Sequence, residues 1–312
     1  MLNRRDFLKN SGALALGSLA LPGQAADLFS PKAKFEPGVQ LFTTMSVIDK
    51  DLSGTLQQIA SIGYKNIESA FSMKGGFYGL KPKEFATLVK DLGMNWQSHH
   101  AIGAPFRMPA RPAQPDANGQ AAPARTMPKM PPMKDLMNNS QEIVDDAAEG
   151  GVKYLVCAST PIKTLDEVKQ SLEVLQKTGE ACKKAGITLA YHNHSAEFEP
   201  VEGQLPFDIF ASQTSPDILK FELDIAWAIK AGVDPVALFK KHEGRFPLWH
   251  VKDLNKETKN PVEIGKGYID YKPIFAAAKS AGMKYFFVEQ DGAPSPVENL
   301  TTSYNNLKKV LG

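Results

Sequence analysis

The sequence predicts a single (β/α)8 barrel, and three observations support this prediction. From residue 38 onward, short β-branched or aromatic runs alternate with amphipathic stretches of roughly ten to twenty residues, which is typical of parallel strands joined by crossover helices. We count eight such units in the chain, as a barrel of this type requires. A doubly wound open sheet is the alternative, but no G-x-G-x-x-G motif follows the first run to support a dinucleotide site.

The eight expected strands follow one another at intervals that leave room for a helix. In order they read VQLFT (39–43), NIESA (66–70), NWQSH (95–99), YLVCA (154–158), TLAYH (188–192), KFELD (220–224), PLWHV (247–251) and YFFVE (285–289). Branched and aromatic residues give these runs their β propensity. Glycines precede five of them by two or three residues, and each would end the preceding helix: Gly63, Gly93, Gly151, Gly186 and Gly282.

One proline-rich segment interrupts the alternation. Residues 103–133 are rich in proline, alanine and glycine and nearly lack branched apolar side chains, so they cannot build a core of their own. We expect a long loop after the third strand, inserted in one barrel domain over residues 26–312. Such loops lie on the catalytic face of a barrel, so one interpretation is a lid over the site. A disordered surface insertion is the other, and both stay open.

Residues 1–25 are typical of a signal peptide. Arg4 and Arg5 precede an apolar run over residues 13–21, and a small-x-small cleavage pattern ends at Ala25. The arginine pair before Phe-Leu-Lys resembles a twin-arginine signal, with an ordinary Sec signal as the alternative. The run is too short for a mature transmembrane helix. We therefore expect a periplasmic protein that is not inserted in the membrane after processing.

Charge and cysteine content exclude several classes of protein. The chain has 36 Lys and Arg against 34 Asp and Glu, and the basic residues are scattered, which counts against nucleic-acid binding. Cys157 and Cys182 are too few for a disulfide framework and have no zinc-ligand spacing, so we expect buried thiols. A small molecule is the expected partner, and oligomers are compatible with the sequence.

Polar residues at the ends of the expected strands are the functional candidates, because these ends meet at one mouth of the barrel. Ionisable groups crowded there would repel one another or lose hydration unless a divalent cation neutralised them. Imidazole and carboxylate ligands together suit Mn²⁺, Zn²⁺, Co²⁺ or Fe²⁺, and a carboxylate-rich set also holds Mg²⁺. The candidates are Glu68, His99, His100, His192, Asn193, His194, Glu197, Glu222, Asp224, His250, Lys252, Asp253, Glu289, Gln290 and Asp291.

Five short motifs carry a resemblance to a known family. They are FELDIAW (221–227), AGVDP (231–235), HVKD (250–253), EIGKG (263–267) and VEQD (288–291). Together they resemble the xylose-isomerase-like sugar phosphate isomerase/epimerase family. The resemblance implies a (β/α)8 barrel that binds one divalent metal ion (Mn, Mg, Zn or Co) and moves protons next to the carbonyl of a sugar or cyclic polyol. It also implies that Asp224, His250 and Glu289 are metal ligands.

The fifth strand departs from the family pattern. Relatives commonly have a glutamate there that is both ligand and acid/base, whereas this chain has His192 in the sequence AYHNH. Strand alternation places His192 and His194 on the same side, and Glu197 follows in the loop. We expect Glu197 to be the fourth metal ligand, with His192 or His194 as the alternatives.

The expected reaction is the transfer of a proton next to a carbonyl, for which a base and an acid must flank the substrate carbon. Glu289, together with Glu197 or a histidine, is the candidate pair. Lys252 would neutralise an oxyanion or contact a hydroxyl; alternatively it forms an ion pair with Asp253 at the rim.

The remaining candidates would bind the sugar. Glu68, His100, His192 and His194 would contact its hydroxyls. Trp227 and Trp249 would provide an apolar wall, or pack in the core.

An isomerase or epimerase is the favoured function, and two other functions stay open. On the same scaffold, the metal and base could expel a glycosidic oxygen from a keto-glycoside, which would make the protein a lyase or hydrolase. The second alternative is a protein that binds a sugar without converting it. An abasic-site endonuclease on a related barrel is disfavoured, because the sequence indicates no basic groove.

Overall fold

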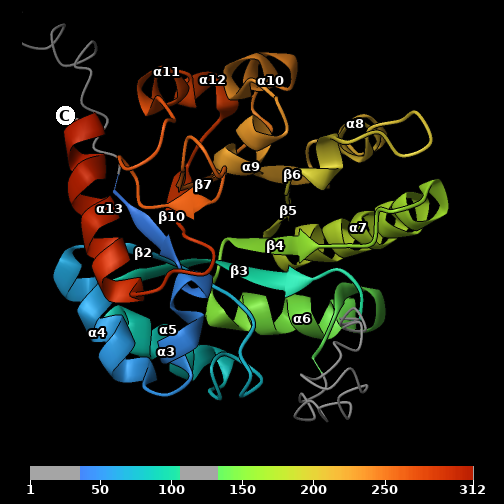
Figure 1. The fold of residues 1–312 in the computed structure, drawn as a ribbon. Helices are drawn as coiled ribbons and strands as arrows, with labels where there is room; N and C mark the ends of the chain where they lie inside the picture. Colours follow the sequence, from blue (N-terminus) through green and yellow to red (C-terminus); the bar gives the residue numbers. More distant parts are fainter. Residues whose placement is uncertain (1–35, 106–132, 312) are drawn as a thin grey trace, which may run out of the picture. The chain divides into compact units, whose positions relative to one another are not determined.

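The structure is a computed structural model that describes residues 36–105 and 133–311. In this part of the chain, eight parallel strands close into a barrel in the order β1-β10-β7-β6-β5-β4-β3-β2, which confirms the predicted fold (Figure 1). The strands are β1 (Gly38–Gln40), β2 (Asn66–Ser69), β3 (Asn95–Ile102), β4 (Tyr154–Ser159), β5 (Thr188–His192), β6 (Lys220–Asp224), β7 (Leu248–Val251) and β10 (Tyr285–Val288).

Two strands, β1 and β3, differ in length from the prediction by more than one residue, and the others agree with it within one residue. β1 ends at Gln40, because its side chain accepts a hydrogen bond from the Phe42 backbone N–H at 3.0 Å and the chain turns into a 3-10 helix, η2 (Leu41–Thr44). β3 continues to Ile102, because its last residues still pair with β4 as far as Ser159. The longer β3 brings His99 and His100 inside the strand, where successive side chains point to opposite faces.

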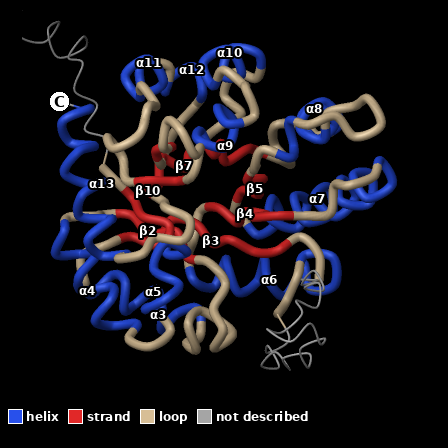
Figure 2. Tube along the Cα trace, viewed as in Figure 1, coloured by secondary structure: helices blue, strands red, loops and turns tan. Residues whose placement is uncertain are grey.

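Helices cover the outside of the barrel (Figures 1 and 2). Several end at glycines in the left-handed conformation, as predicted for Gly63, Gly151, Gly186 and Gly282. Besides η2, the helices of the described residues are α3 (Met45–Ile48), α4 (Leu52–Ile62), α5 (Pro82–Asp91), α6 (Leu136–Gly150), α7 (Leu165–Ala185), η3 (Ala196–Phe198), α8 (Pro206–Gln213), α9 (Ile225–Lys230), α10 (Pro235–Lys241), α11 (Tyr271–Ala276), α12 (Ala278–Ala281) and α13 (Pro296–Leu311).

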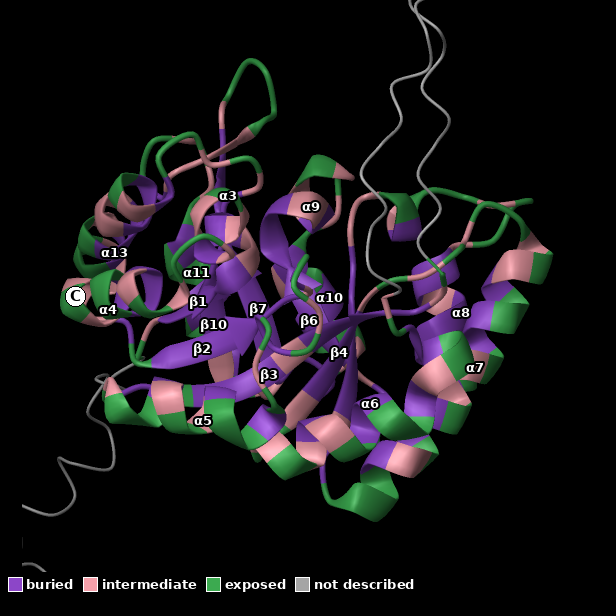
Figure 3. Cartoon of the chain, turned by 90° about the horizontal axis from the view of Figure 1, so that it is seen from below, coloured by how far each residue is buried: buried purple, intermediate pink, exposed green. Residues whose placement is uncertain are grey.

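The barrel interior changes from apolar to ionisable along the strands. A buried apolar cluster of Val156, Ala190, Leu248 and Phe287 comes from four of them. Because inward-facing positions recur every second residue, the next inward positions on β5, β7 and β10 are His192, His250 and Glu289. Figure 3 shows that the barrel strands are mostly buried while the outer faces of the helices are exposed. The polar residues predicted from strand ends therefore lie directly above the barrel core.

Three further findings concern the sequence predictions. Cys157 and Cys182 are free and buried, as predicted. In the part of the chain that the structure describes, no helix is both long and apolar enough to cross a membrane. The predicted signal peptide over residues 1–25 and nearly all of the predicted loop over residues 103–133 lie outside the described residues, so both stay predictions.

Candidate active site

Two buried glutamates form the floor of the site. Glu68 on β2 accepts hydrogen bonds from Gln40 Nε2 at 2.8 Å and from the Ser98 hydroxyl. All three residues are fully buried. The imidazoles of His100 and His250 hold the pKa of Glu68 below its usual value, even though burial alone would raise it. Glu68 is therefore a fixed anion beneath the mouth.

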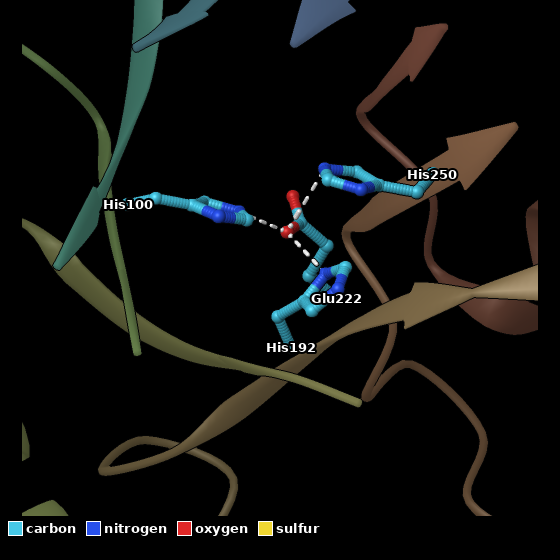
Figure 4. Close-up of side chains that lie close together, drawn as sticks. All are labelled: His100, His192, Glu222 and His250. Carbon is cyan, nitrogen blue, oxygen red and sulfur yellow. Dashed lines mark hydrogen bonds and ion pairs between the residues drawn. The ribbon is translucent and has the colours of Figure 1, made fainter. Parts of the chain in front are cut away.

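Glu222 on β6 is the second glutamate, and three imidazoles converge on one of its oxygens (Figure 4). Oε2 lies 2.6 Å from His100 Nε2, 3.0 Å from His192 Nδ1 and 3.2 Å from His250 Nε2. Its other oxygen, Oε1, is buried without a hydrogen-bond partner in the described part of the chain. Burial and the neighbouring Glu68 raise the pKa of Glu222 to about 7.

His192 and His250 turn their other ring nitrogens toward Asp224 and Glu289. His192 Nε2 lies 3.8 Å from Asp224 Oδ2, and His250 Nδ1 lies 3.9 Å from the same oxygen and 2.9 Å from Glu289 Oε2. Burial and the neighbouring cations keep the pKa of His192 well below its usual value. Its Nδ1–H therefore donates to Glu222, and the Nε2 lone pair faces Asp224.

Lys252 is buried between three carboxylates. Its Nζ lies 2.8 Å from Asp224 Oδ2 and 2.7 Å from Asp291 Oδ2, and it also donates to Glu289 Oε2. Burial lowers the pKa of Lys252, but the carboxylates outweigh it and hold the pKa well above its usual value. Its ammonium and His250 keep the pKa of Glu289 low despite burial.

The predicted alternative of an ion pair between Lys252 and Asp253 is wrong, because the Asp253 carboxylate is occupied by a loop. It accepts hydrogen bonds from the backbone N–H groups of Gly265, Gly267 and Ile269. A side chain at Gly267 would clash with Asp253 Oδ1, which an added Cβ would approach to 2.1 Å. The EIGKG motif therefore has a structural role, holding the loop after the hairpin of β8 (Asp253–Leu254) and β9 (Pro261–Val262).

The cluster has an excess of negative charge. Three cations, Lys252, His250 and His100, face five carboxylates: Glu68, Glu222, Asp224, Glu289 and Asp291. Burial lowers the pKa of His100, but the carboxylates of Glu68 and Glu222 outweigh this effect and raise it to about 9. With all five acids ionised, two negative charges are left over, and a divalent ion bound at His250 in place of a proton would reduce this excess to one. An uncompensated charge of this size is costly to bury. The donor set therefore fits a divalent metal ion.

Among the residues that the structure describes, two sets of side chains have ligand atoms that lie within 4.8 Å of one another: Asp224, His250 and Glu289; and His100, His192, Glu222 and His250. In the second set, Glu222 Oε2 is hydrogen-bonded to its neighbours. Ligand atoms around a tetrahedral ion at about 2.0–2.2 Å stand roughly 3.3 Å or more apart, so contacts of 2.6 and 3.0 Å are too short. The first set also has one contact below this limit, 2.9 Å between His250 Nδ1 and Glu289 Oε2, but Asp224 Oδ2 lies 3.9 Å from His250 Nδ1 and 3.8 Å from His192 Nε2. It therefore has fewer short contacts than the second set.

Glu197 lies apart from both sets, although the sequence favoured it as a ligand. Its Oε1 accepts a hydrogen bond from the Tyr191 hydroxyl at 2.7 Å, and its Oε2 accepts one from the His194 backbone N–H at 2.8 Å. It is buried in this position. Glu197 therefore holds the turn that carries His194, whose ring is 4.9 Å from that of His192.

The two tryptophans differ in position. The Trp227 ring lies 6.2 Å from that of His194, and Lys252 Nζ is 5.5 Å from its centre, so Trp227 borders the site. Trp249 is fully buried and stacks on Phe239, which is a packing role.

Sequence reasoning did not assign roles to Gln40, Ser98 or Glu222. Glu222 was among the strand-end candidates, and its position two residues before Asp224 could have indicated its role, because both side chains face inward on β6. Gln40 and Ser98 gave no such signal, since their importance lies in contacts with Glu68 across neighbouring strands.

Comparison with known proteins identifies the family. The sequence profile described as "Xylose isomerase-like TIM barrel" matches residues 56–310. The chain belongs to this family. The barrel described above agrees with this family, as the sequence motifs indicated.

The individual relatives share only about a quarter of their aligned residues with this chain, or fewer. Inosose dehydratase of Geobacillus thermodenitrificans is 25% identical over 188 residues, which are 54% of this chain and 62% of that protein. The chain thus spans less than two thirds of the length of this curated relative. A solved sugar phosphate isomerase/epimerase from Parabacteroides distasonis is 27% identical with a TM-score of 0.69, covering 89% of this chain and 95% of that one. The structure of IOLI protein with a binding zinc atom (16% identity, TM-score 0.65, 89% and 98% covered) shares the fold.

Proposed function

We propose that this xylose isomerase-like protein is a divalent-metal-dependent enzyme that moves a proton next to the carbonyl of a sugar or keto-sugar. The observation that carries the proposal is the arrangement of His192 and His250. Each offers one ring nitrogen to the space near Asp224, while Glu222 or Glu68 holds the opposite nitrogen. Carboxylates that orient histidine ligands in this way are a regular feature of metal sites.

Asp224, His250 and Glu289 would hold the ion, with His192 as the fourth ligand in place of Glu197. When bound, the ion would supply a Lewis acid that polarises the carbonyl oxygen and stabilises charge on it. The name of the zinc-binding neighbour agrees with a divalent ion, and the mixed donor set suits Mn²⁺, Zn²⁺ or Co²⁺ as well as Mg²⁺.

The proton would move between protein groups on either side of the substrate carbon. Glu289 is one candidate, since its carboxylate reaches the mouth and stays ionised. His194 is the other, because it is only partly buried and its ring lies beside Trp227, in the segment where the sequence placed an acid or base. Lys252 would donate a hydrogen bond to an oxygen that becomes negative, because its ammonium is desolvated and fixed by three carboxylates.

A lyase or hydrolase acting on a keto-glycoside is the second candidate function. It needs the same first step, the removal of a proton next to a carbonyl. Relatives named inosose dehydratase favour elimination chemistry as much as relatives named epimerase favour isomerisation. We also propose, on the basis of residues 1–25, that the protein is exported to the periplasm. There it would meet free sugars rather than phosphorylated ones.

Metal analysis of Asp224→Asn tests the ligand set. Asn keeps the oxygen that caps α9 by accepting from the Trp227 backbone N–H, so the fold should survive while metal content falls well below one ion per chain. Asp234→Asn is the matched control, because Asp234 caps α10 in the same way outside the site. Equal metal content in both variants would remove Asp224 from the site.

Isotope exchange tests the reaction. The metal-loaded protein is incubated with keto-sugars and keto-glycosides in D₂O, and deuterium entering next to the carbonyl is measured. Glu289→Gln should reduce the exchange rate by about 10²-fold or more, as for other positioned bases. Full exchange in metal-replete Glu289→Gln would place the base in the 192–197 segment. Binding of these sugars by the wild type without any exchange would indicate a sugar-binding protein.

A further inference from the structure

A pocket of about 150 Å³ adjoins the cluster on the side of β3. It is lined by His99, His100 and Ile102 of β3, by Phe71 and Phe77 of the segment after β2, and by Asp146 of α6, among others. His100 also contacts Glu222 and Glu68, so the pocket shares a wall with the proposed active site. Its volume has room for a single ring-sized group.

His99 presents a fixed hydrogen-bond donor to this pocket. Its Nδ1 lies 2.8 Å from the Ser69 hydroxyl, which already accepts a hydrogen bond from Trp96 Nε1. Ser69 is fully buried, and His99 Nδ1 is the one acceptor for its proton among the described residues. The hydroxyl therefore donates to Nδ1, and the ring proton lies on Nε2. Apart from the hydroxyl and the backbone of Ser69, the His99 ring has no hydrogen-bond partner in the described part of the chain, so Nε2, the nitrogen farther from Ser69, is available to a ligand.

The other walls favour an uncharged ligand with an apolar face. Phe71 and Phe77 are aromatic, and Phe77 meets the His99 ring edge-on at 4.8 Å. Lys134 lines the pocket, but its ammonium is 2.8 Å from both Glu142 and Asp146 and is thereby neutralised. His100, the other cation that lines the pocket, is paired with Glu68 and Glu222. A phosphate would therefore find an imidazole N–H without an unpaired cation beside it. A sugar ring, with acceptor hydroxyls and an apolar face, matches these groups.

We propose that this pocket binds a second, unreacted sugar ring of the substrate, so that the substrate is an unphosphorylated keto-glycoside of at least two rings. The inference rests on the proposed function, because it places the reacting ring at the neighbouring cluster. The keto-glycoside lyase or hydrolase is accordingly the form of that function that the pocket favours. His99 acts here as a specificity residue that contacts the ring which does not react.

The test compares a two-ring with a one-ring substrate. His99→Phe keeps the ring and removes the N–H, and Ser69→Ala combined with His99→Phe also removes the hydroxyl that would otherwise lack an acceptor. His242→Phe is the matched control, since His242 packs against Phe207 and does not line the pocket. We measure kcat/KM of metal-replete protein for 3-keto-disaccharides and for the matching 3-keto methyl glycosides.

We expect the preference for the disaccharides to fall roughly tenfold or more in both His99 variants, the usual effect of losing one buried hydrogen bond, and to persist in His242→Phe. An undiminished preference in both His99 variants, or no preference in the wild type, overturns the pocket assignment.

Binding separates this inference from the proposed function. Calorimetric titration with cellobiose, maltose, sucrose and trehalose, each compared with methyl glucoside, requires no turnover. Tighter binding of a disaccharide that is lost in the double variant supports the pocket even if no exchange in D₂O occurs, in which case only the proposed reaction fails. If exchange occurs but every disaccharide binds no better than methyl glucoside, the pocket assignment fails and the proposed function stands.

Discussion

Replacing Lys252 with Met should destabilise the metal-free protein strongly. The ammonium is fully buried and lies within 2.8 Å of the oxygens of Asp224 and Glu289, which are also buried. Met retains most of the stem but leaves Asp224 and Glu289 without the ammonium, and only Glu289 keeps a close cation, His250 at 2.9 Å. Removing one partner of a buried ion pair costs about 3–5 kcal/mol. For a domain of this size, roughly 2–4 °C of Tm corresponds to 1 kcal/mol, so a fall of about 6–20 °C follows.

A divalent ion should reverse much of this loss. Lys252 and the proposed ion neutralise the same two carboxylates, so the variant gains more from the ion than the wild type does. The stabilisation grows with the ratio of free metal to Kd, and removing the competing ammonium lowers Kd. The rise in Tm on adding Mn²⁺ or Zn²⁺ should therefore be larger in Lys252→Met.

Differential scanning calorimetry with EDTA or with added metal measures both effects. Lys220→Met is the control, because Lys220 also lies on the barrel but donates to the Gly244 carbonyl rather than to a carboxylate. Its loss should cost about 1 kcal/mol and leave the metal response unchanged. The reasoning is refuted if Lys252→Met loses no more stability than Lys220→Met and shows the metal response of the wild type.

Three further predictions use other parts of the chain. Glu197→Gln should keep the metal content of the wild type and lose about 1–3 kcal/mol of stability, because its two oxygens accept hydrogen bonds from Tyr191 and His194; reduced metal content would make Glu197 a ligand after all. Burial lowers the pKa of His99 to about 3 in the folded state, so the wild type loses stability as the pH falls from 6.5 toward 3, by at most about 1.4 kcal/mol per pH unit. His99→Phe lacks this contribution and should show a shallower acid decline in chemical unfolding, whereas equal slopes would contradict the assignment. Arg4→Lys with Arg5→Lys should leave the protein in the cytoplasm, as cell fractionation would show, because the twin-arginine receptor recognises that pair while the Sec route needs only positive charge; normal processing would indicate a Sec signal.

The sequence by itself determined the barrel and the level of the site along it. Strand runs, helix-ending glycines and the spacing between them are local properties of the chain, so they predicted all eight strands within a few residues. The position of His192, Asp224, His250 and Glu289 at strand ends then placed them at one mouth of the barrel, because the carboxyl ends of parallel strands converge there. Charge crowding at the mouth was visible for the same reason.

Only the tertiary structure decided which atoms meet. Lys252 pairs with Asp224, Glu289 and Asp291 rather than with its neighbour Asp253, because loop backbone N–H groups already occupy Asp253. Glu197 turns to Tyr191 because a loop residue has no fixed period, and its direction follows from the partners that fold around it. The orientation of each imidazole likewise depends on contacts between strands far apart in sequence, such as β2 with β7, which no local pattern encodes.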